Sequence, residues 1–457
     1  MMRNQYYIVL LLLVTSSVAY GQYNLSTTYY AHNDLNAARY EPSELELGDR
    51  SFQFGLNSYV WAGNTSLNFS KFSDLFNGSE FNSSDIDEIV SSFGDQNRFG
   101  AGFDLQYGGL AFQIRTKNDK RFDFSFTVVD KSGVNLNLTD DMLDMIWKGN
   151  KQFAGKTIDF GDNEINANWW REYAFGAAFP LFGSNGREEG VGMRLGFRAK
   201  YIQGLAAIHM EQNRILMTTA ADGSSITMDY DYVLNTAGID DISNFDPFQS
   251  NGSGFGLDIG AALFVGPKLE FNASIIDLGS VSYDKQTKTY RKSGVFTYEG
   301  QIVSQLFGDV QLQNEASYIF SPDETAGESF DMLLGTKLLL QAEFKTPKSE
   351  EREGDKRDLE YVSNAFYVTY IQGLRDVPGA TTRPYIAVAY NHDFHKHFDL
   401  GTMVGYGGFN QLTLGGFISV NIANFLKIGF GTDNLTPLII PKSGTGIDGS
   451  FNLSISL

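Results

Sequence analysis

The clearest pattern in the chain is an alternation of apolar and polar side chains along residues 252–283. Two apolar rows there are interrupted at every second position by glycine, carboxylate, ammonium, amide or hydroxyl groups. A period of two predicts β-strands. Residues 265–267 (Val-Gly-Pro) predict a three-residue loop that pairs Phe264 with Lys268 in a hairpin. One face of this hairpin is apolar and the other polar, which suits a soluble sandwich or a membrane barrel equally.

The same alternation recurs along most of the chain and predicts about fourteen strands of roughly nine to eleven residues, the length of a tilted membrane crossing. Gly108-Gly109 predicts a two-residue turn between two of them. The last strand runs to the final residue, Leu457, as is expected of a strand that closes a barrel on the first one. The predicted strands lie at 51–56, 99–107, 110–114, 122–128, 191–201, 254–264, 268–275, 365–371, 384–391, 399–406, 411–421, 424–431 and 451–457, with another beginning at Trp169-Trp170.

Short helices and polar connections are predicted between the strands. Residues 139–148 begin with Thr139, which can cap a helix, and carry Asp140 and Asp141 in the first turn. Helices are also predicted at 83–93 and 299–310. Residues 131 to about 169 are expected to form a long connection, and the charged run at 345–360 a solvated loop.

Composition supports a barrel and excludes several kinds of site. The 457 residues include 48 glycines and only 10 prolines, and 14% are aromatic, which suits a barrel with aromatic girdles. A formal net charge of -19 argues against nucleic acid as a partner. Cysteine is absent, so disulfides and thiolate metal sites are excluded.

The N-terminus predicts export. Arg3, an apolar stretch at 8–14 and Ala19-Tyr20-Gly21 form the pattern of a signal peptide cleaved after Gly21. The apolar stretch is shorter than the ~18–20 residues of a membrane helix. We therefore expect three parts: a signal peptide (1–21), a polar N-terminal luminal segment (22–50), and a transmembrane antiparallel β-barrel (51–457) of all-β class with short helices in its extracellular loops. The expected location is the bacterial outer membrane.

Several of these features together resemble a known group of proteins. They are the signal peptide, the polar stretch with Asn36-Ala37-Ala38, the strand pair at 252–264 and 269–283, the insertion near Glu299 and the closing residues 429–457. They resemble an uncharacterised family of outer-membrane barrels from Bacteroidota, which is similar to FadL-type fatty acid transporters and PorV-type barrels. In FadL-type barrels an Asn-Pro-Ala element belongs to a luminal hatch. The resemblance implies a hatch here, formed by Asn36, Ala37 and Ala38, with Ala37 in place of the proline.

Charged side chains on the polar faces of the strands are the candidate lumen-lining or ligand-binding residues. We expect the acids and bases among them to pair inside the barrel, since unpaired buried charges are costly. No catalytic residue, metal site or cofactor is predicted; His392, His395 and His397 are close in sequence, but a turn does not make them converge. The candidates are Asp104, Arg115, Asp123, Arg194, Arg198, Asp258, Lys268 and Glu270.

Three functions are compatible with these predictions. The first is FadL-like passive uptake or binding of a hydrophobic small molecule, past a displaced hatch or through a gap in the wall. The second is a non-transporting scaffold that presents its loops to secreted or surface proteins. The third, an enzyme acting on membrane lipid, has no support beyond location. An apolar internal site would favour the uptake function. A lumen filled by ion pairs would favour the scaffold function.

Overall fold

The computed structural model describes most of the chain. The described residues are 30, 35–48, 50–68, 70, 87–89, 91–94, 96–117, 120–183, 190–239, 246–299, 323–352, 355–394, 397–408, 410–422, 425–442 and 444–457. The predicted signal peptide lies outside these residues, as does the helix predicted at 299–310 apart from Glu299.

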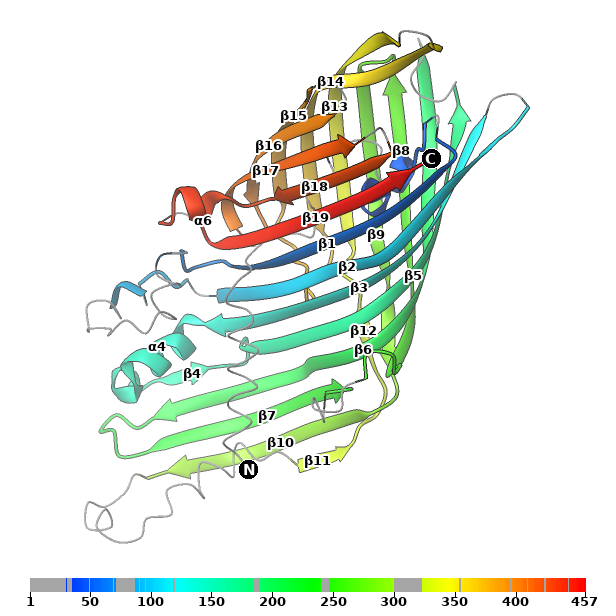
Figure 1. Cartoon of the computed structure of the whole chain (residues 1–457). Coiled ribbons are helices and arrows are strands. Elements are labelled where there is room, and N and C mark those ends of the chain that lie inside the picture. The colour runs from blue at the N-terminus through cyan, green and yellow to red at the C-terminus, as the bar shows by residue number, and fades with distance from the viewer. Residues whose placement is uncertain are drawn as a thin grey trace.

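Fourteen antiparallel strands form a closed barrel, as the alternation predicts (Figure 1). The last strand pairs with the first over eleven positions, from Gln53 opposite Ser456 to Gly63 opposite Gly446. In order around the barrel, the strands are β1 (Phe52–Asn64), β2 (Gln96–Arg115), β3 (Arg121–Thr139), β5 (Glu164–Phe182), β6 (Val191–Thr219), β8 (Gly252–Val265), β9 (Leu269–Tyr283), β13 (Lys337–Arg352), β14 (Asp355–Gly373), β15 (Tyr385–Phe394), β16 (Phe398–Gly407), β17 (Asn410–Ile422), β18 (Leu426–Thr432) and β19 (Gly446–Ser456).

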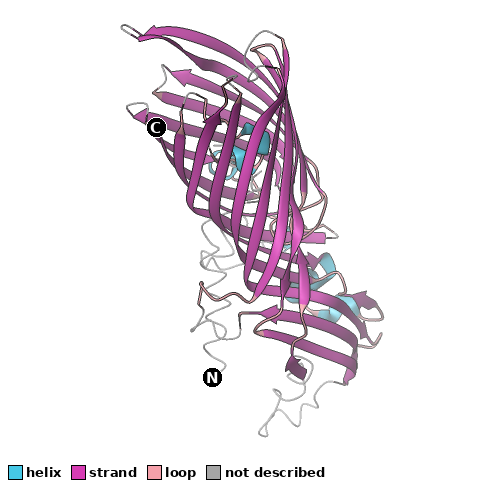
Figure 2. Cartoon of the chain, turned by 90° about the vertical axis from the view of Figure 1, so that its right-hand side faces the viewer, coloured by secondary structure: helices cyan, strands magenta, loops and turns pink. Residues whose placement is uncertain are grey.

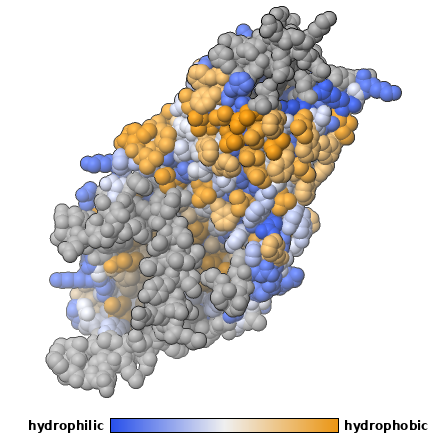
Figure 3. All heavy atoms as spheres, viewed as in Figure 1, coloured by the Kyte–Doolittle hydropathy of each residue, from blue (hydrophilic) through white to orange (hydrophobic). Residues whose placement is uncertain are grey.

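Side chains alternate between the two faces of the wall as the sequence predicts. On β6, Phe197 is 38% exposed and the next residue, Arg198, 2% exposed. Apolar side chains gather over the barrel wall on the outside (Figure 3). Charged and amide side chains on the opposite face of the strands are buried. The barrel is therefore apolar outside and largely polar inside, the reverse of a soluble protein.

At the end of the barrel away from the C-terminus, several strands of the same sheet extend beyond the closed barrel (Figures 1 and 2). The second half of β6 pairs there with β7 (Ile226–Ala237), and β7 pairs with β10 (Thr287–Tyr298). Shorter strands β4 (Thr157–Asp159), β11 (Asp323–Ala326) and β12 (Phe330–Leu333) join β6, β10 and β9. The helix predicted at 139–148 is confirmed as α4 (Asp140–Lys148), with Thr139 accepting a hydrogen bond from the Met142 backbone N–H. A second short helix is α6 (Thr436–Ile439).

Three local predictions are wrong. Gly108-Gly109 is not a turn: β2 passes through it with a bulge, and neither glycine has the positive φ that a primed turn requires. The connection predicted from 131 to 169 is shorter, because β3 continues to Thr139 and β5 begins at Glu164. The charged run at 345–360 belongs to the β13–β14 hairpin, because β13 continues to Arg352 and β14 begins at Asp355.

Candidate functional site: the closed lumen

The N-terminal segment lies inside the barrel, and we call its described residues 35–48 the hatch segment. It forms two single-turn helices, η3 (Ala37–Arg39) and η4 (Pro42–Glu44). Figure 2 shows these helices enclosed by the strands. The three predicted hatch residues, Asn36, Ala37 and Ala38, are each at most 4% exposed.

The hatch segment rests on glycines of the wall. Gly196 of β6 and Gly260 of β8 are cross-strand partners. A Cβ on Gly196 would overlap the backbone of Pro42, and one on Gly260 would overlap the carboxylate of Glu41. A Cβ on Gly109 of β2 would likewise overlap the side chain of Leu35. Glycine is needed at these positions because the backbone of the wall and the hatch segment approach closely.

Ion pairs and hydrogen bonds hold the hatch segment to the wall. Arg39 pairs with Asp104 of β2 at 2.9 Å, and both side chains are buried. Arg198 donates to the Arg39 carbonyl at 3.5 Å.

The C-terminal end of the hatch segment is held by three arginines. Arg194 donates both to the carbonyl of Leu45 and to Asp123, and Asp123 accepts from the Leu47 backbone N–H at 3.3 Å. Arg115 and Arg121 donate to the Gly48 carbonyl at 3.0 and 2.9 Å. Arg115 is exposed at the rim of the barrel and does not line the lumen.

An acidic patch lies between the hatch segment and β9 and β13. Asn272 donates to Glu44 at 2.9 Å. Lys345 donates to Glu270 at 2.5 Å and to Glu343 at 3.5 Å. Glu41 is fully buried and accepts from the Ser43 hydroxyl at 2.7 Å. Carboxyl groups therefore outnumber cations where the hatch segment meets this part of the wall.

A rise in pH should loosen the hatch segment through Glu41, which belongs to no strand. Burial raises the pKa of its carboxyl to about 8, although the Ser43 hydrogen bond opposes the shift. A carboxyl with a raised pKa in the folded state favours the folded state at low pH and loses that contribution as pH rises through the raised value. We expect limited proteolysis at Arg39 to accelerate as pH rises from about 5 towards 8 and to level off above pH 8. In Glu41→Gln the rate should no longer follow this titration, and an unchanged pH profile in that variant would contradict the assignment.

A second ion cluster crosses the centre of the lumen. Asp258 pairs with Arg198 at 2.9 Å and with Lys200 at 2.6 Å. Lys200 also pairs with Asp277 at 2.5 Å. Lys131 of β3 extends the network to β5, pairing with Asp277 at 3.1 Å and with Glu172 at 3.0 Å. The predicted residues Arg198 and Asp258 thus meet in one network.

Asp277 was missed by the sequence analysis for a structural reason. The alternation along β9 directs position 277 outward, because Phe271 and Ile275 face outward. A bulge opposite β8 and a φ of 57° at Asp277 turn its side chain inward. The Asp277 backbone N–H donates to Asp258 at 2.7 Å, which satisfies the group that the bulge frees.

Lys268 does not line the lumen. β9 begins at Leu269 and pairs Val265 with it, so Lys268 lies in the turn and is exposed. The predicted partner of Phe264 is replaced by Glu270, which is 1% exposed. The loop is shifted by one residue from the predicted position, and this shift moves Lys268 out of the strand.

A buried apolar cluster lies on the inner face of β13–β17, beside polar side chains such as Gln341, Glu343 and Asp399, and the sequence analysis also missed it. Ala37 and Tyr40 of the hatch segment, together with Tyr30, cover this wall. The rings of Tyr30 and Tyr367 are tilted by 49° with their centroids 4.9 Å apart, and the Tyr30 hydroxyl donates to Thr369 at 3.2 Å. The buried side chains of this inner wall include Leu339, Tyr367, Ile371, Tyr385, Met403 and Phe417.

The connection between β14 and β15 closes the other end of the lumen. Asn135 of β3 donates to the Val377 carbonyl at 2.7 Å and accepts from the Gly379 backbone N–H at 3.3 Å. A Cβ on Gly133 would lie 2.8 Å from the backbone of Pro378 and Gly379. The described lumen is therefore occupied from both sides, by the hatch segment and by this inward-folded connection.

Two further features concern the described residues alone. No helix among them has the length and apolar character needed to cross a membrane. No three histidine, aspartate or glutamate side chains in this part of the chain are grouped to hold a metal ion. His392 is hydrogen-bonded to Asn364 at 2.8 Å.

Solved structures with a similar fold are outer-membrane channels. The chain is similar to the Pseudomonas putida toluene transporter TodX (9% identity, 96% of this chain and 95% of that one, TM-score 0.40) and to the Ralstonia pickettii toluene transporter TbuX (10%, 92% and 93%, 0.41). It is also similar to a Pseudomonas aeruginosa FadL homologue (11%, 96% and 98%, 0.42). At these identities and TM-scores no function is transferred to this chain.

The sequence comparison identifies the family without a function. No curated protein matches the chain. The model of DUF5723, a family of unknown function, matches residues 48–433. This range contains β1 to β18 and the glycines on which the hatch segment rests. The chain belongs to the DUF5723 family.

Proposed function

We propose that this protein is an outer-membrane barrel that binds a small hydrophobic compound and lets it pass when the hatch segment moves. The observation that carries the proposal is the buried apolar cluster on the inner wall of β13–β17, which lies directly beneath Tyr30, Ala37 and Tyr40. A hatch segment that left this wall would expose the apolar side chains of this cluster to the lumen.

The outward face supports a position in a membrane. Asp130 of β3 and Arg171 of β5 form a bidentate pair, at 2.6 and 3.0 Å, on the same face as the exposed Tyr107. Tyr107 donates to Asp130 at 2.9 Å, and the Arg171 guanidinium lies 5.5 Å from its ring. The nine residues from Arg121 to Asp130 correspond to ~23 Å along the axis of a barrel with the usual tilt. This matches the apolar band of outer-membrane barrels, with charges and aromatic rings at both borders.

The polarity of the lumen wall determines which side of the lumen a passing compound would follow. Ions would meet the buried charge network of β2–β8, whose members are already paired, whereas an apolar compound could follow the opposite wall. Passage requires the hatch segment to move, because side chains of the wall are hydrogen-bonded to its backbone carbonyls. Arg194 donates to the Leu45 carbonyl and Ser274 donates to the Tyr40 carbonyl. Signal peptide cleavage after Gly21 is part of the proposal, because it would leave residues 22–50 free to enter the barrel from the periplasmic side.

A binding measurement with paired variants tests the proposal. Met403 of β16 faces the lumen and Val404, the next residue, faces outward. We expect purified protein to bind a dansyl-labelled long-chain fatty acid saturably, and Met403→Asn to weaken binding about tenfold, since a buried Met side chain contributes roughly 1.5–3 kcal/mol. Val404→Asn should leave binding unchanged. Equal affinity in all three proteins would contradict a luminal apolar site.

The scaffold is the second candidate because a specific observation favours it. The lumen holds paired charges, and the β6–β7–β10 sheet with α4 forms an ordered surface beyond the barrel. A secreted or surface protein that co-purifies in stoichiometric amount, without any bound apolar compound, would favour this function over uptake.

A further inference from the structure

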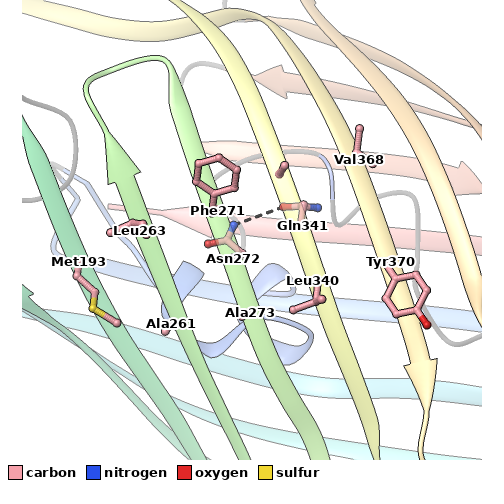
Figure 4. A pocket seen from close by; sticks show the side chains of 11 residues that line it. Met193, Ala261, Leu263, Phe271, Asn272, Ala273, Leu340, Gln341, Val368 and Tyr370 are labelled. Carbon is pink, nitrogen blue, oxygen red and sulfur yellow. Dashed lines mark hydrogen bonds between the residues drawn. The ribbon is translucent and has the colours of Figure 1, made fainter.

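The outer wall of the barrel carries an apolar groove next to the turn at Lys268. The groove has a volume of about 500 Å³ and spans β8, β9, β13 and β14 (Figure 4). Its floor consists of three alanines, and larger apolar side chains stand around them. The floor residues are Ala261, Ala273 and Ala342, and the rim includes Phe271, Leu340 and Val368.

The register of the strands produces this shape. Ala261 and Ala273 are cross-strand partners, and Phe271 is opposite Ala342. Three small side chains on adjacent strands thus interrupt an outward surface that elsewhere carries Phe, Leu and Val. Neighbouring positions face the lumen, where Asn272 bonds to Gln341 at 3.4 Å (Figure 4) and to Glu44 of the hatch segment at 2.9 Å. The groove is therefore separated from the hatch segment by the thickness of the wall.

The height of the groove along the barrel wall indicates which kind of molecule covers it. Antiparallel pairing puts the turn at 266–268 at the same end of the barrel as the start of β1 and the end of β19. Phe271 lies three residues from Lys268, a distance of ~10 Å at the usual rise of a strand. In the membrane position proposed above, the groove would open at the depth of acyl chains, and Lys268, which is exposed, would lie at the depth of their headgroups. The backbone N–H of Lys345 donates to the Lys268 carbonyl at 2.8 Å, which fixes the turn beside the groove.

We propose that this groove binds one acyl chain of a phospholipid from the leaflet at that end, with the lipid phosphate at Lys268. The inference rests on the membrane position proposed above. A hydrocarbon chain matches the apolar lining, and the phosphate supplies the anion that complements Lys268. The bound lipid would cover the wall opposite Asn272 and Glu44 and would keep this part of the wall closed.

Native mass spectrometry with added phosphatidylglycerol tests the proposal. Wild type should retain one lipid per barrel, and Ala273→Phe, which fills the groove, should retain about tenfold less, since each buried methylene contributes roughly a factor of four in affinity. Lys268→Gln should reduce retention and its salt dependence. Val404→Phe adds the same ring to the outer face of β16, away from the groove, and should behave as wild type.

The outcomes distinguish a failure of the groove proposal from a failure of the proposed membrane position. Equal retention in Ala273→Phe and wild type would overturn the proposal, as would a loss in Lys268→Gln alone. Each variant is first checked for outer-membrane fractionation and for resistance to SDS without boiling. A wild-type protein that does not fractionate with the membrane would overturn the membrane position and with it the groove. A membrane-embedded barrel without a difference between variants would overturn the groove alone.

Discussion

Replacing Gly196 with valine should force the hatch segment out of its seat. The side chain would occupy the space that the backbone of Pro42 and Ser43 fills, and neither the wall nor that backbone can shift without breaking neighbouring hydrogen bonds. Overpacking of this kind costs roughly 1–3 kcal/mol, which corresponds to about a 5-fold to 150-fold rise in the displaced population. Trypsin should then cleave at Arg39, which is buried in the seated hatch segment.

A matched glycine distinguishes displacement of the hatch segment from damage to a strand. Gly449 of β19 also lies in the wall, but a Cβ there meets nothing within 4 Å. Gly449→Val should leave cleavage at Arg39 at the wild-type rate. If both variants were cleaved alike, the effect would come from the strands, and the glycine seat would not control the hatch segment.

Removing the Arg39 side chain should have the second large effect. Arg39→Ala leaves Asp104 buried without the partner that lies 2.9 Å away in the wild type. Breaking one side of a buried pair typically costs about 3–5 kcal/mol. Here the loss falls on the seated hatch segment, because Arg39 belongs to it and Asp104 to β2. We expect rapid proteolysis of residues 35–48 while the barrel keeps its resistance to SDS.

A double-mutant cycle measures the contribution of this pair. Arg39→Ala with Asp104→Ala should be less destabilising than the sum of the single changes, since the second substitution removes the buried carboxylate that has lost Arg39. Additive effects would mean that the two residues do not interact. The pair would then not hold the hatch segment.

The barrel could be predicted from the sequence because the same alternation of inward and outward side chains recurs in its strands. Alternation assigns a face to each residue wherever a strand is regular, and Arg198 and Asp258 accordingly lie inside. The rule fails where the backbone departs from a regular strand. A bulge turns Asp277 inward, and a shift of one residue in a turn puts Lys268 outside. Neither change leaves a signal in the order of apolar and polar residues.

The contents of the lumen were harder to predict. The hatch segment has no periodicity, so the sequence suggested it only by resemblance. The apolar cluster on the inner wall of β13–β17 is hidden for another reason: strands apolar on both faces, such as the one containing Met403 and Val404, lose the contrast between inside and outside. The sequence places the glycines that contact the hatch segment in strands. It does not show that they contact the hatch segment, because Pro42 and Glu41 are distant from them in sequence.

The most direct test of a movable hatch segment uses the absence of native cysteine. Ser274 of β9 donates to the Tyr40 carbonyl at 2.8 Å, so the thiols of a Tyr40→Cys, Ser274→Cys variant can be joined by a short, cleavable dithiol-reactive linker. Uptake of the dansyl-labelled fatty acid into vesicles containing the barrel is then measured before and after the bridge is broken. The account predicts little uptake with the bridge and recovery after its cleavage. Equal uptake in both states would contradict passage through the lumen.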